Sequence, residues 1–145
     1  MSCGTSAGPY AALVREFELE LRHLKQMLAL AAEEQRDLVA GDMTRLESIS
    51  AEKLVQLHSL ERYAVRRASF LAEQGFAAGA RGLAACALAA GRRGHELTTA
   101  WKRVVDALAD LRDQNEENST LLRARLAELG GPSLAVTDLS GLTRD

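Results

Sequence analysis

The sequence predicts an all-α protein: an antiparallel bundle of three long helices, with a short Ala-rich helix before the third and a flexible C-terminal tail. Apolar residues make up 47% of the 145 residues but aromatic residues only 4%. This balance favours helices rich in leucine and alanine over a β-sandwich. Both prolines, Pro9 and Pro132, lie near the chain ends, so no proline interrupts the heptad repeats between them.

The first long helix is expected to begin near Pro9, because proline suits the first turn of a helix. Apolar residues then recur at heptad spacing in two series that share one face: Tyr10, Phe17, Leu24, Ala31, Leu38 and Val14, Leu21, Leu28. This spacing predicts a bundle or coiled-coil helix. Gly41 interrupts the pattern, and we expect Asp42 to cap the next helix.

The second long helix is expected to form an antiparallel hairpin with the first, because the turn between them is short. Its apolar seam consists of Leu46, Ile49, Leu57, Leu60, Ala64 and Leu71. Lys53 and Arg67 interrupt this seam, and we expect their aliphatic stems to lie along the edge of the bundle with the charges in water. Gly75 is expected to end the helix.

Residues 75–94 have a different composition, GFAAGARGLAACALAAGRRG. The apolar run from Leu83 to Ala90 is expected to form a short helix with a small apolar face. The surrounding glycines weaken it, since glycine costs about 1 kcal/mol per site relative to alanine in a helix. We therefore expect a mobile connector that contains a short helix.

The heptad pattern returns near His95 and stops at Gly130-Gly131-Pro132, which predicts the end of the third long helix. Its two series are Leu97, Val104, Leu111, Asn118 and Trp101, Leu108, Asn115, Leu122, Leu129. At position 125 the strict repeat meets Arg125 and the stripe moves to Leu126, as a helix of 3.6 residues per turn predicts.

Asn115 and Asn118 thus occupy positions where the repeat favours apolar side chains. In a structural interpretation, each amide bonds to a neighbouring helix and fixes the register of the bundle. In a functional interpretation, the pair marks where the helix passes from the bundle core to a partner-binding groove. The pattern alone leaves both interpretations open.

The domain organisation expected is a helical bundle over residues 1–131 and a disordered tail over residues 132–145. The tail contains scattered apolar residues that it cannot bury alone. Three helices cannot readily enclose seams this continuous, so we expect a partly open groove along the third helix. An amphipathic helix of a partner would fit such a groove, or a homodimer would close it.

Signals for catalysis or metal binding are weak. The phosphate-binding, dinucleotide-binding, nucleophile-elbow and zinc-peptidase motifs do not occur. Glu20 and His23 match half of a di-iron helix motif, but no second copy exists and we expect both on a solvated face. His58 is expected at the boundary of a helix face, and His95 near the start of the third helix. The prediction is no enzyme, no catalytic residue, no cofactor and no metal.

The charge pattern and the cysteines predict a cytoplasmic protein. The formal net charge is −2, with acids and bases interspersed, which argues against a nucleic-acid partner. Cys3 and Cys86 form no CxxC pair and fit a reducing compartment. We expect no secretory signal, because no basic residue precedes Arg15 and no apolar signal core follows the start. The longest apolar run, Leu83 to Ala90, is too short to span a bilayer. We expect no membrane insertion.

Three stretches resemble the FlgN family of flagellar export chaperones, over about residues 13 to 129. The first runs from Leu13 to Asp42, with acidic helix faces closed by AGDMTRLESI. The second is EKLVQLHSLERYAVRRASFLAEQG. The third is WKRVVDALADLRDQNEENSTLL, a tryptophan followed by Asn-x-x-Asn and an apolar stretch.

This resemblance implies a chaperone that binds the hook–filament junction proteins FlgK and FlgL through their C-terminal amphipathic helices. It would prevent their premature assembly and deliver them to the flagellar type III export apparatus. The resemblance places client binding in the C-terminal part, at Asn115, Asn118, Leu122, Leu126, Leu129, Leu134 and Leu139. Two alternatives remain: a FliT-type chaperone of the filament cap protein, and a structural coiled-coil adaptor or dimer without a transport role.

Overall fold

The computed structural model describes residues 8–130. Within this range the chain forms four α-helices and one short 3-10 helix: α1 (Gly8–Ala40), α2 (Leu46–Glu73), α3 (Ala80–Ala89), η2 (Gly91–Arg93) and α4 (Gly94–Leu129). The predicted all-helical class is thereby confirmed, and α3 is the short Ala-rich helix. The predicted tail, residues 132–145, lies outside the described residues.

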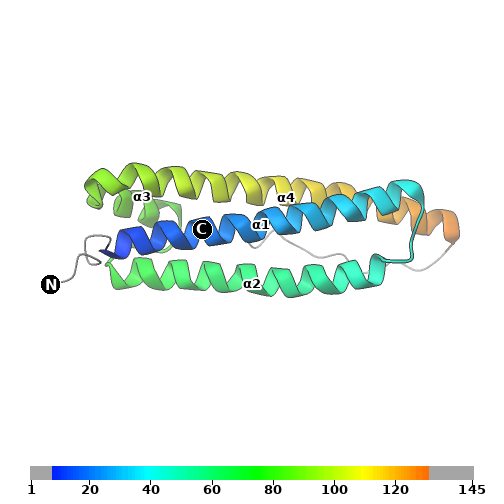
Figure 1. Ribbon diagram of the computed structural model, residues 1–145, viewed down its shortest axis with the longest axis horizontal. Coiled ribbons are helices and arrows are strands. Elements are labelled where there is room, and N and C mark those ends of the chain that lie inside the picture. The colour runs from blue at the N-terminus through cyan, green and yellow to red at the C-terminus, as the bar shows by residue number, and fades with distance from the viewer. Residues whose placement is uncertain (1–7, 131–145) are drawn as a thin grey trace.

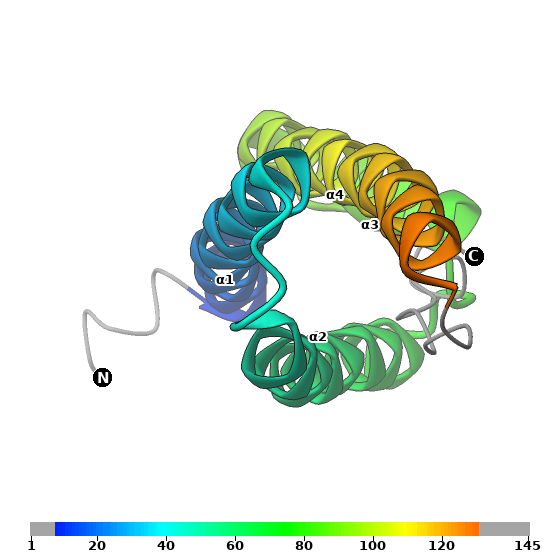
Figure 2. The same ribbon diagram turned by 90° about the vertical axis from the view of Figure 1, so that its right-hand side faces the viewer.

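The three long helices lie side by side along the long axis of the molecule, with α3 beside the start of α4 (Figure 1). The helix α2 runs back along α1, whereas α4 runs in the same direction as α1. Contacts between α1 and α4 follow this parallel order: Phe17 with Trp101, Ala31 with Asn118, and Leu38 with Arg125. The view along the axis places α1 between α2 and α4 (Figure 2), and α1 packs against both.

One buried apolar cluster joins all four helices. It consists of Leu13, Phe17, Leu24, Met27, Ala31, Leu57, Leu60, Leu71, Leu83, Cys86, Leu97, Val104, Ala107, Leu108 and Leu111. Burial of apolar surface is the main force that holds such helices together. Leu38, Leu46 and Ile49 are also buried, outside this cluster, near the corner between α1 and α2.

The corner between α1 and α2 differs from the prediction in one detail. Gly41 ends α1 with a φ of 73°, and the Asp42 N–H donates to the Asp37 carbonyl at 2.8 Å. The prediction that Asp42 caps α2 is wrong, because α2 begins only at Leu46. The Asp42 carboxylate accepts hydrogen bonds from the Thr44 N–H at 3.1 Å and hydroxyl at 2.7 Å, which closes a local turn before the helix.

Residues 75–94 contain the predicted short helix, and this helix packs against the rest of the bundle. Gly75 ends α2 as predicted, with a φ of 83°. Leu83 and Cys86 of α3 are 4% and 0% exposed. A Cβ atom at Gly82 would lie 1.5 Å from the Ala77 carbonyl oxygen, so only glycine fits there. The glycines therefore permit close backbone packing, which their composition alone does not distinguish from mobility.

Candidate functional site

One level of the bundle is polar and contains buried side chains from all three long helices. We call Glu34, Lys53, Asn115 and Asn118 the polar layer; each is at most 6% exposed. The Lys53 ammonium donates to Glu34 Oε1 at 3.0 Å and to Asn115 Oδ1 at 2.6 Å. The Asn118 amide donates to Glu34 Oε1 at 2.7 Å and to the Ala31 carbonyl at 2.8 Å. The hydrogen bonds of the polar layer therefore connect α1, α2 and α4 at one position along the bundle axis.

The position of Lys53 corrects a prediction. We expected its ammonium in water at the edge of the bundle, but its side chain is only 4% exposed. An acid from α1 and an amide from α4 enclose the charge. A buried charge is tolerated only where it is paired and hydrogen-bonded, and here it is both.

A second ion pair, with a buried acid and a partly buried base, joins α1 and α2 further along the bundle. Arg67 Nη1 lies 2.8 Å from Glu20 Oε1, and the guanidinium lies 4.5 Å from the centre of the Trp101 ring. The solvated position predicted for Glu20 is therefore wrong, since this residue is 3% exposed. Burial raises the pKa of the Glu20 carboxyl above its ordinary value, and the Arg67 charge opposes this rise.

The residues of the two ion pairs, Glu34–Lys53 and Glu20–Arg67, are equally spaced along their helices. Fourteen residues separate the members of each of three pairs: Glu20 and Glu34, Lys53 and Arg67, Trp101 and Asn115. Fourteen residues are two heptads, or about 21 Å of helix. Two acids on one helix and two bases on the next, at the same interval, are a signal in the sequence for ion pairs between the two helices. A search for apolar periodicity alone does not detect this signal.

The helix α4 extends beyond its last buried side chain. That side chain is Ser119, whereas Leu122 and Leu126 are half-buried and Leu129 is 69% exposed. We call these three leucines the leucine stripe. Their spacing of four and then three residues places them on one face of the helix. The end of α4 thus presents apolar side chains that the bundle does not cover completely.

The candidate client-binding residues therefore fall into separate groups. Asn115 and Asn118 lie beneath the surface in the polar layer, as the structural interpretation expects. The leucine stripe lies at the surface, one turn further along α4. Leu134 and Leu139 lie outside the described residues.

Arg125 connects the end of α4 to the end of α1. Its Nε donates to the Leu38 carbonyl at 2.8 Å, and its Nη2 donates to the Val39 carbonyl at 2.6 Å. Its Nη1 also lies 3.1 Å from Glu128 Oε2. The last turn of α1 contains no basic residue, so Arg125 supplies the positive charge that stabilises a helix C-terminus. The sequence marked Arg125 only as an interruption of the apolar stripe.

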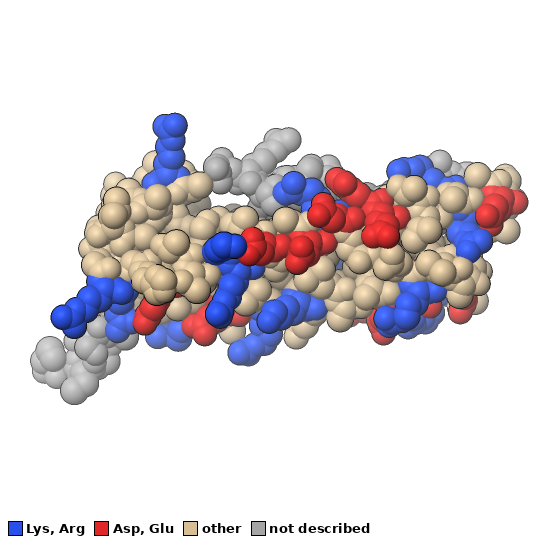
Figure 3. Space-filling model, turned by 90° about the horizontal axis from the view of Figure 1, so that it is seen from above, with Lys and Arg blue, Asp and Glu red and all other residues tan. Residues whose placement is uncertain are grey.

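The outer face of α4 is acidic before the leucine stripe begins. Figure 3 shows acidic side chains gathered in the middle of the face on which α4 lies. The exposed acids of this part of α4 are Asp106, Asp110, Asp113, Glu116 and Glu117.

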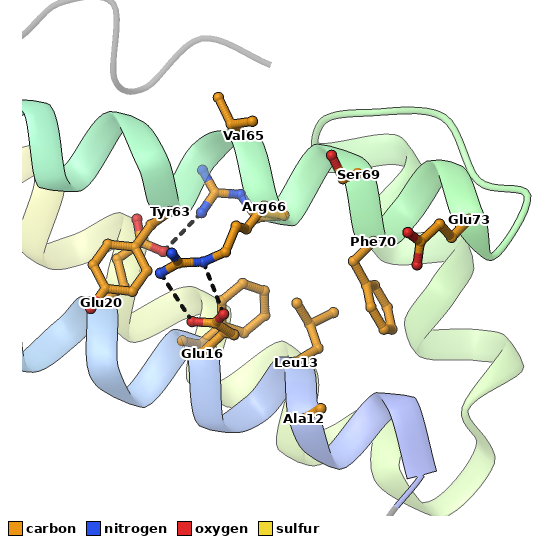
Figure 4. A pocket seen from close by; sticks show the side chains of 12 residues that line it. Ala12, Leu13, Glu16, Glu20, Tyr63, Val65, Arg66, Ser69, Phe70 and Glu73 are labelled. Carbon is orange, nitrogen blue, oxygen red and sulfur yellow. Dashed lines mark hydrogen bonds and ion pairs between the residues drawn. The ribbon is translucent and has the colours of Figure 1, made fainter.

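A cavity of about 340 Å³ lies between the start of α1 and the end of α2 (Figure 4). Leu13 and Phe70 line its apolar part. Arg66 Nε lies 3.0 Å from Glu16 Oε1 across the cavity. The nearby Arg67 is likewise paired with a glutamate of α1, so the arginines of the cavity already have anionic partners.

The histidines singled out in the sequence have different surroundings. His23 is half-buried, with its ring edge-on to Tyr63 at 6.0 Å between centres. The His58 side chain is 65% exposed and lies 3.4 Å from Glu61, and His95 is exposed. Between residues 8 and 130, no group of three or more His, Cys, Asp or Glu side chains could hold a metal ion.

The geometry defines a class of protein: an all-helical bundle that presents the apolar end of one helix at its surface. The family model described as FlgN protein matches residues 10–131, and the chain belongs to the FlgN family. The resemblance found in the sequence is thereby confirmed. Membership supports a role as a chaperone in flagellar synthesis and export.

The fold is similar to a crystal structure of a Pseudomonas aeruginosa protein described as a flagella synthesis protein, FlgN. The two chains are 26% identical, and the TM-score is 0.68. The match covers 82% of this chain and 91% of that chain. A search of curated proteins gave no match. Among the described residues, no helix has the length and apolar character needed to cross a membrane.

Proposed function

We propose that this chain is a cytoplasmic chaperone of flagellar type III export. It binds the C-terminal amphipathic segments of the hook–filament junction proteins FlgK and FlgL, prevents their premature assembly and delivers them to the export apparatus. Membership of the FlgN family supports the general role. The binding-site proposal rests on the leucine stripe, which lies on the part of α4 after its last fully buried residue, Ser119.

The stripe suits an amphipathic helix of a client. Leu122, Leu126 and Leu129 provide apolar contacts at the spacing with which helices pack against one another. Burial of a leucine stabilises a contact by about 2 kcal/mol, but ordering a disordered client segment opposes binding. The balance gives a moderate affinity, which a chaperone needs because it must release its client.

The remaining candidate residues have distinct roles in this proposal. Leu134 and Leu139 extend the client-binding surface beyond α4. Asn115 and Asn118 lie at the end of the apolar core and bond α4 to the other two long helices just before the leucine stripe. Their amides already bond to groups of α1 and α2, so we assign the direct client contact to the leucines.

The test is titration of the full chain with a synthetic peptide that spans the C-terminal helices of the cognate FlgK, followed by calorimetry. The wild-type chain should bind one peptide. Replacement of both Leu126→Asp and Leu129→Asp should abolish binding while circular dichroism keeps the helical signal. The matched control is Val65→Asp, because Val65 is an apolar residue of α2 with a similar exposure of 65%. Binding that survives the double replacement would contradict this site.

The same titration separates the alternatives. A peptide from the filament cap protein should bind more weakly than the FlgK and FlgL peptides; tighter binding would indicate a FliT-type chaperone. A second copy of the chain would cover the stripe in a structural dimer. Light scattering that shows a tight dimer, together with no peptide binding, would favour the structural adaptor.

A further inference from the structure

We propose that Arg125 is a positioning residue, which fixes the last turns of α4 and the leucine stripe against the end of α1. This inference rests on the proposed function, because it assigns Arg125 a role in presenting the same surface to a client. The leucines would touch the client, whereas Arg125 would act through the helix that carries them.

The first step is the geometry at the end of α1. The last four carbonyls of a helix lack partners within the helix. The turn after α1 provides N–H donors to the Asp37 and Leu38 carbonyls. The forked guanidinium of Arg125 reaches the two successive carbonyls of Leu38 and Val39, with donor–acceptor distances of 2.8 and 2.6 Å. A guanidinium suits this arrangement because its N–H groups are fixed in one plane.

The second step is the register between α1 and α4. The Asn118 amide donates to the Ala31 carbonyl at 2.8 Å. Arg125 repeats this contact one heptad further along both helices, where it donates to the Leu38 carbonyl. A side chain of α4 thus bonds to the backbone of α1 at both levels. Arg125 continues the register beyond Ser119, the last fully buried residue of α4.

The third step is the close approach of Arg125 to the corner between α1 and α2. A Cβ atom at Gly41 would lie 4.0 Å from Arg125 Cζ. Gly41 has a φ of 73° and ends α1 in a fixed turn. The guanidinium therefore lies against this turn, beside the end of α1 whose carbonyls it bonds.

Positioning matters because helix ends fray when few contacts hold them. If a client binds only the helical form, its apparent affinity equals the affinity for that form multiplied by the fraction of chains that are helical. A contact that keeps residues 120–129 helical therefore raises the affinity without touching the client.

The test compares Arg125→Gln and Arg125→Lys with the control Arg123→Gln, whose native residue is exposed two positions away on the same helix. Hydrogen exchange of the backbone amides of residues 120–129 is measured by mass spectrometry on the full chain. We expect faster exchange in Arg125→Gln and an intermediate rate in Arg125→Lys, since lysine keeps the charge but not the fork. The control, and the amides of residues 97–111 in every variant, should keep wild-type rates.

The second measurement is binding of the FlgK peptide to the same variants. We expect Arg125→Gln to weaken binding about fivefold. This factor corresponds to a helical end of α4 in about one-fifth of the chains. Wild-type exchange in Arg125→Gln overturns the proposal, and so does faster exchange with unchanged affinity. If the wild-type chain binds no client peptide, the proposed function fails. The exchange rates then still decide whether Arg125 holds the end of α4.

Discussion

The ammonium of Lys53 on α2 and the side-chain carbonyl oxygen of Asn115 on α4 lie 2.6 Å apart. This hydrogen bond joins two helices that each pack mainly against α1. Lys53 also bonds to Glu34 of α1, so one buried charge connects all three long helices. Loss of any member leaves a buried polar group without its partner, and this makes the layer sensitive to single substitutions.

Asn115→Leu tests the polar layer directly. The heptad pattern alone predicts that leucine at this position stabilises the seam. The structure predicts the opposite, because Lys53 would lose an acceptor while remaining buried. We expect the free energy of unfolding in urea to fall by about 1–3 kcal/mol. Glu116→Leu, at the exposed neighbouring position, is the control and should change it by less than about 0.5 kcal/mol. A more stable Asn115→Leu chain would contradict the assignment.

Lys53→Met should destabilise the chain more strongly, by about 3 kcal/mol, because it leaves the Glu34 carboxylate buried without its counter-charge. Adding Glu34→Gln should recover part of this loss. The neutral amide removes the unpaired charge, yet its oxygen can still accept the hydrogen bond from Asn118. Guanidinium unfolding of both single variants and the double variant gives the coupling energy. A coupling energy near zero would show that the pair does not act as a unit.

Glu20→Gln should remove one contribution to the pH dependence of stability. Burial raises the pKa of Glu20 above its ordinary value of 4.5, although the nearby Arg67 charge opposes this rise. The folded chain therefore keeps this proton to a higher pH than the unfolded chain does. As a result, the contribution of Glu20 to the free energy of unfolding falls as pH rises from 4.5 through the folded-state pKa.

Unfolding in urea across the acid-to-neutral range measures this contribution as the difference between wild type and Glu20→Gln. Glu18→Gln is the control, because Glu18 is exposed on the same helix. If wild type and Glu20→Gln show parallel pH profiles, burial does not perturb this carboxyl in the way described.

Gly82→Ala should lower the melting temperature. In an unhindered helix, alanine is more stable than glycine by about 1 kcal/mol, so helix propensity alone predicts an increase. The added Cβ would instead lie 1.5 Å from the Ala77 carbonyl oxygen, which belongs to the backbone and cannot rotate away. Ala85→Gly, at an exposed position of the same helix, provides the propensity effect for comparison. Thermal unfolding followed by circular dichroism measures both; a higher melting temperature for Gly82→Ala would contradict the close packing.

The apolar periodicity predicted the long helices because it depends only on local spacing. In one heptad series of the first helix, Phe17, Leu24, Ala31 and Leu38 are buried and Tyr10 is partly buried. The same reasoning does not identify Glu20 and Glu34 as buried, because their basic partners lie on another helix. Composition also did not reveal the packing of residues 75–94, since glycine has the same local effect in a mobile segment and in a close contact.

The sequence by itself determined the helical class, the approximate helix boundaries, the seam and the resemblance to the FlgN family, because these depend on the order and spacing of residues along one chain. Only the tertiary structure decided which polar residues are buried and what they bond. Lys53 and Arg67 needed acids on another helix, and Arg125 needed the backbone carbonyls of Leu38 and Val39 at the end of α1. Such partners are distant in sequence, and the stability of a buried charge depends on them rather than on its own neighbours.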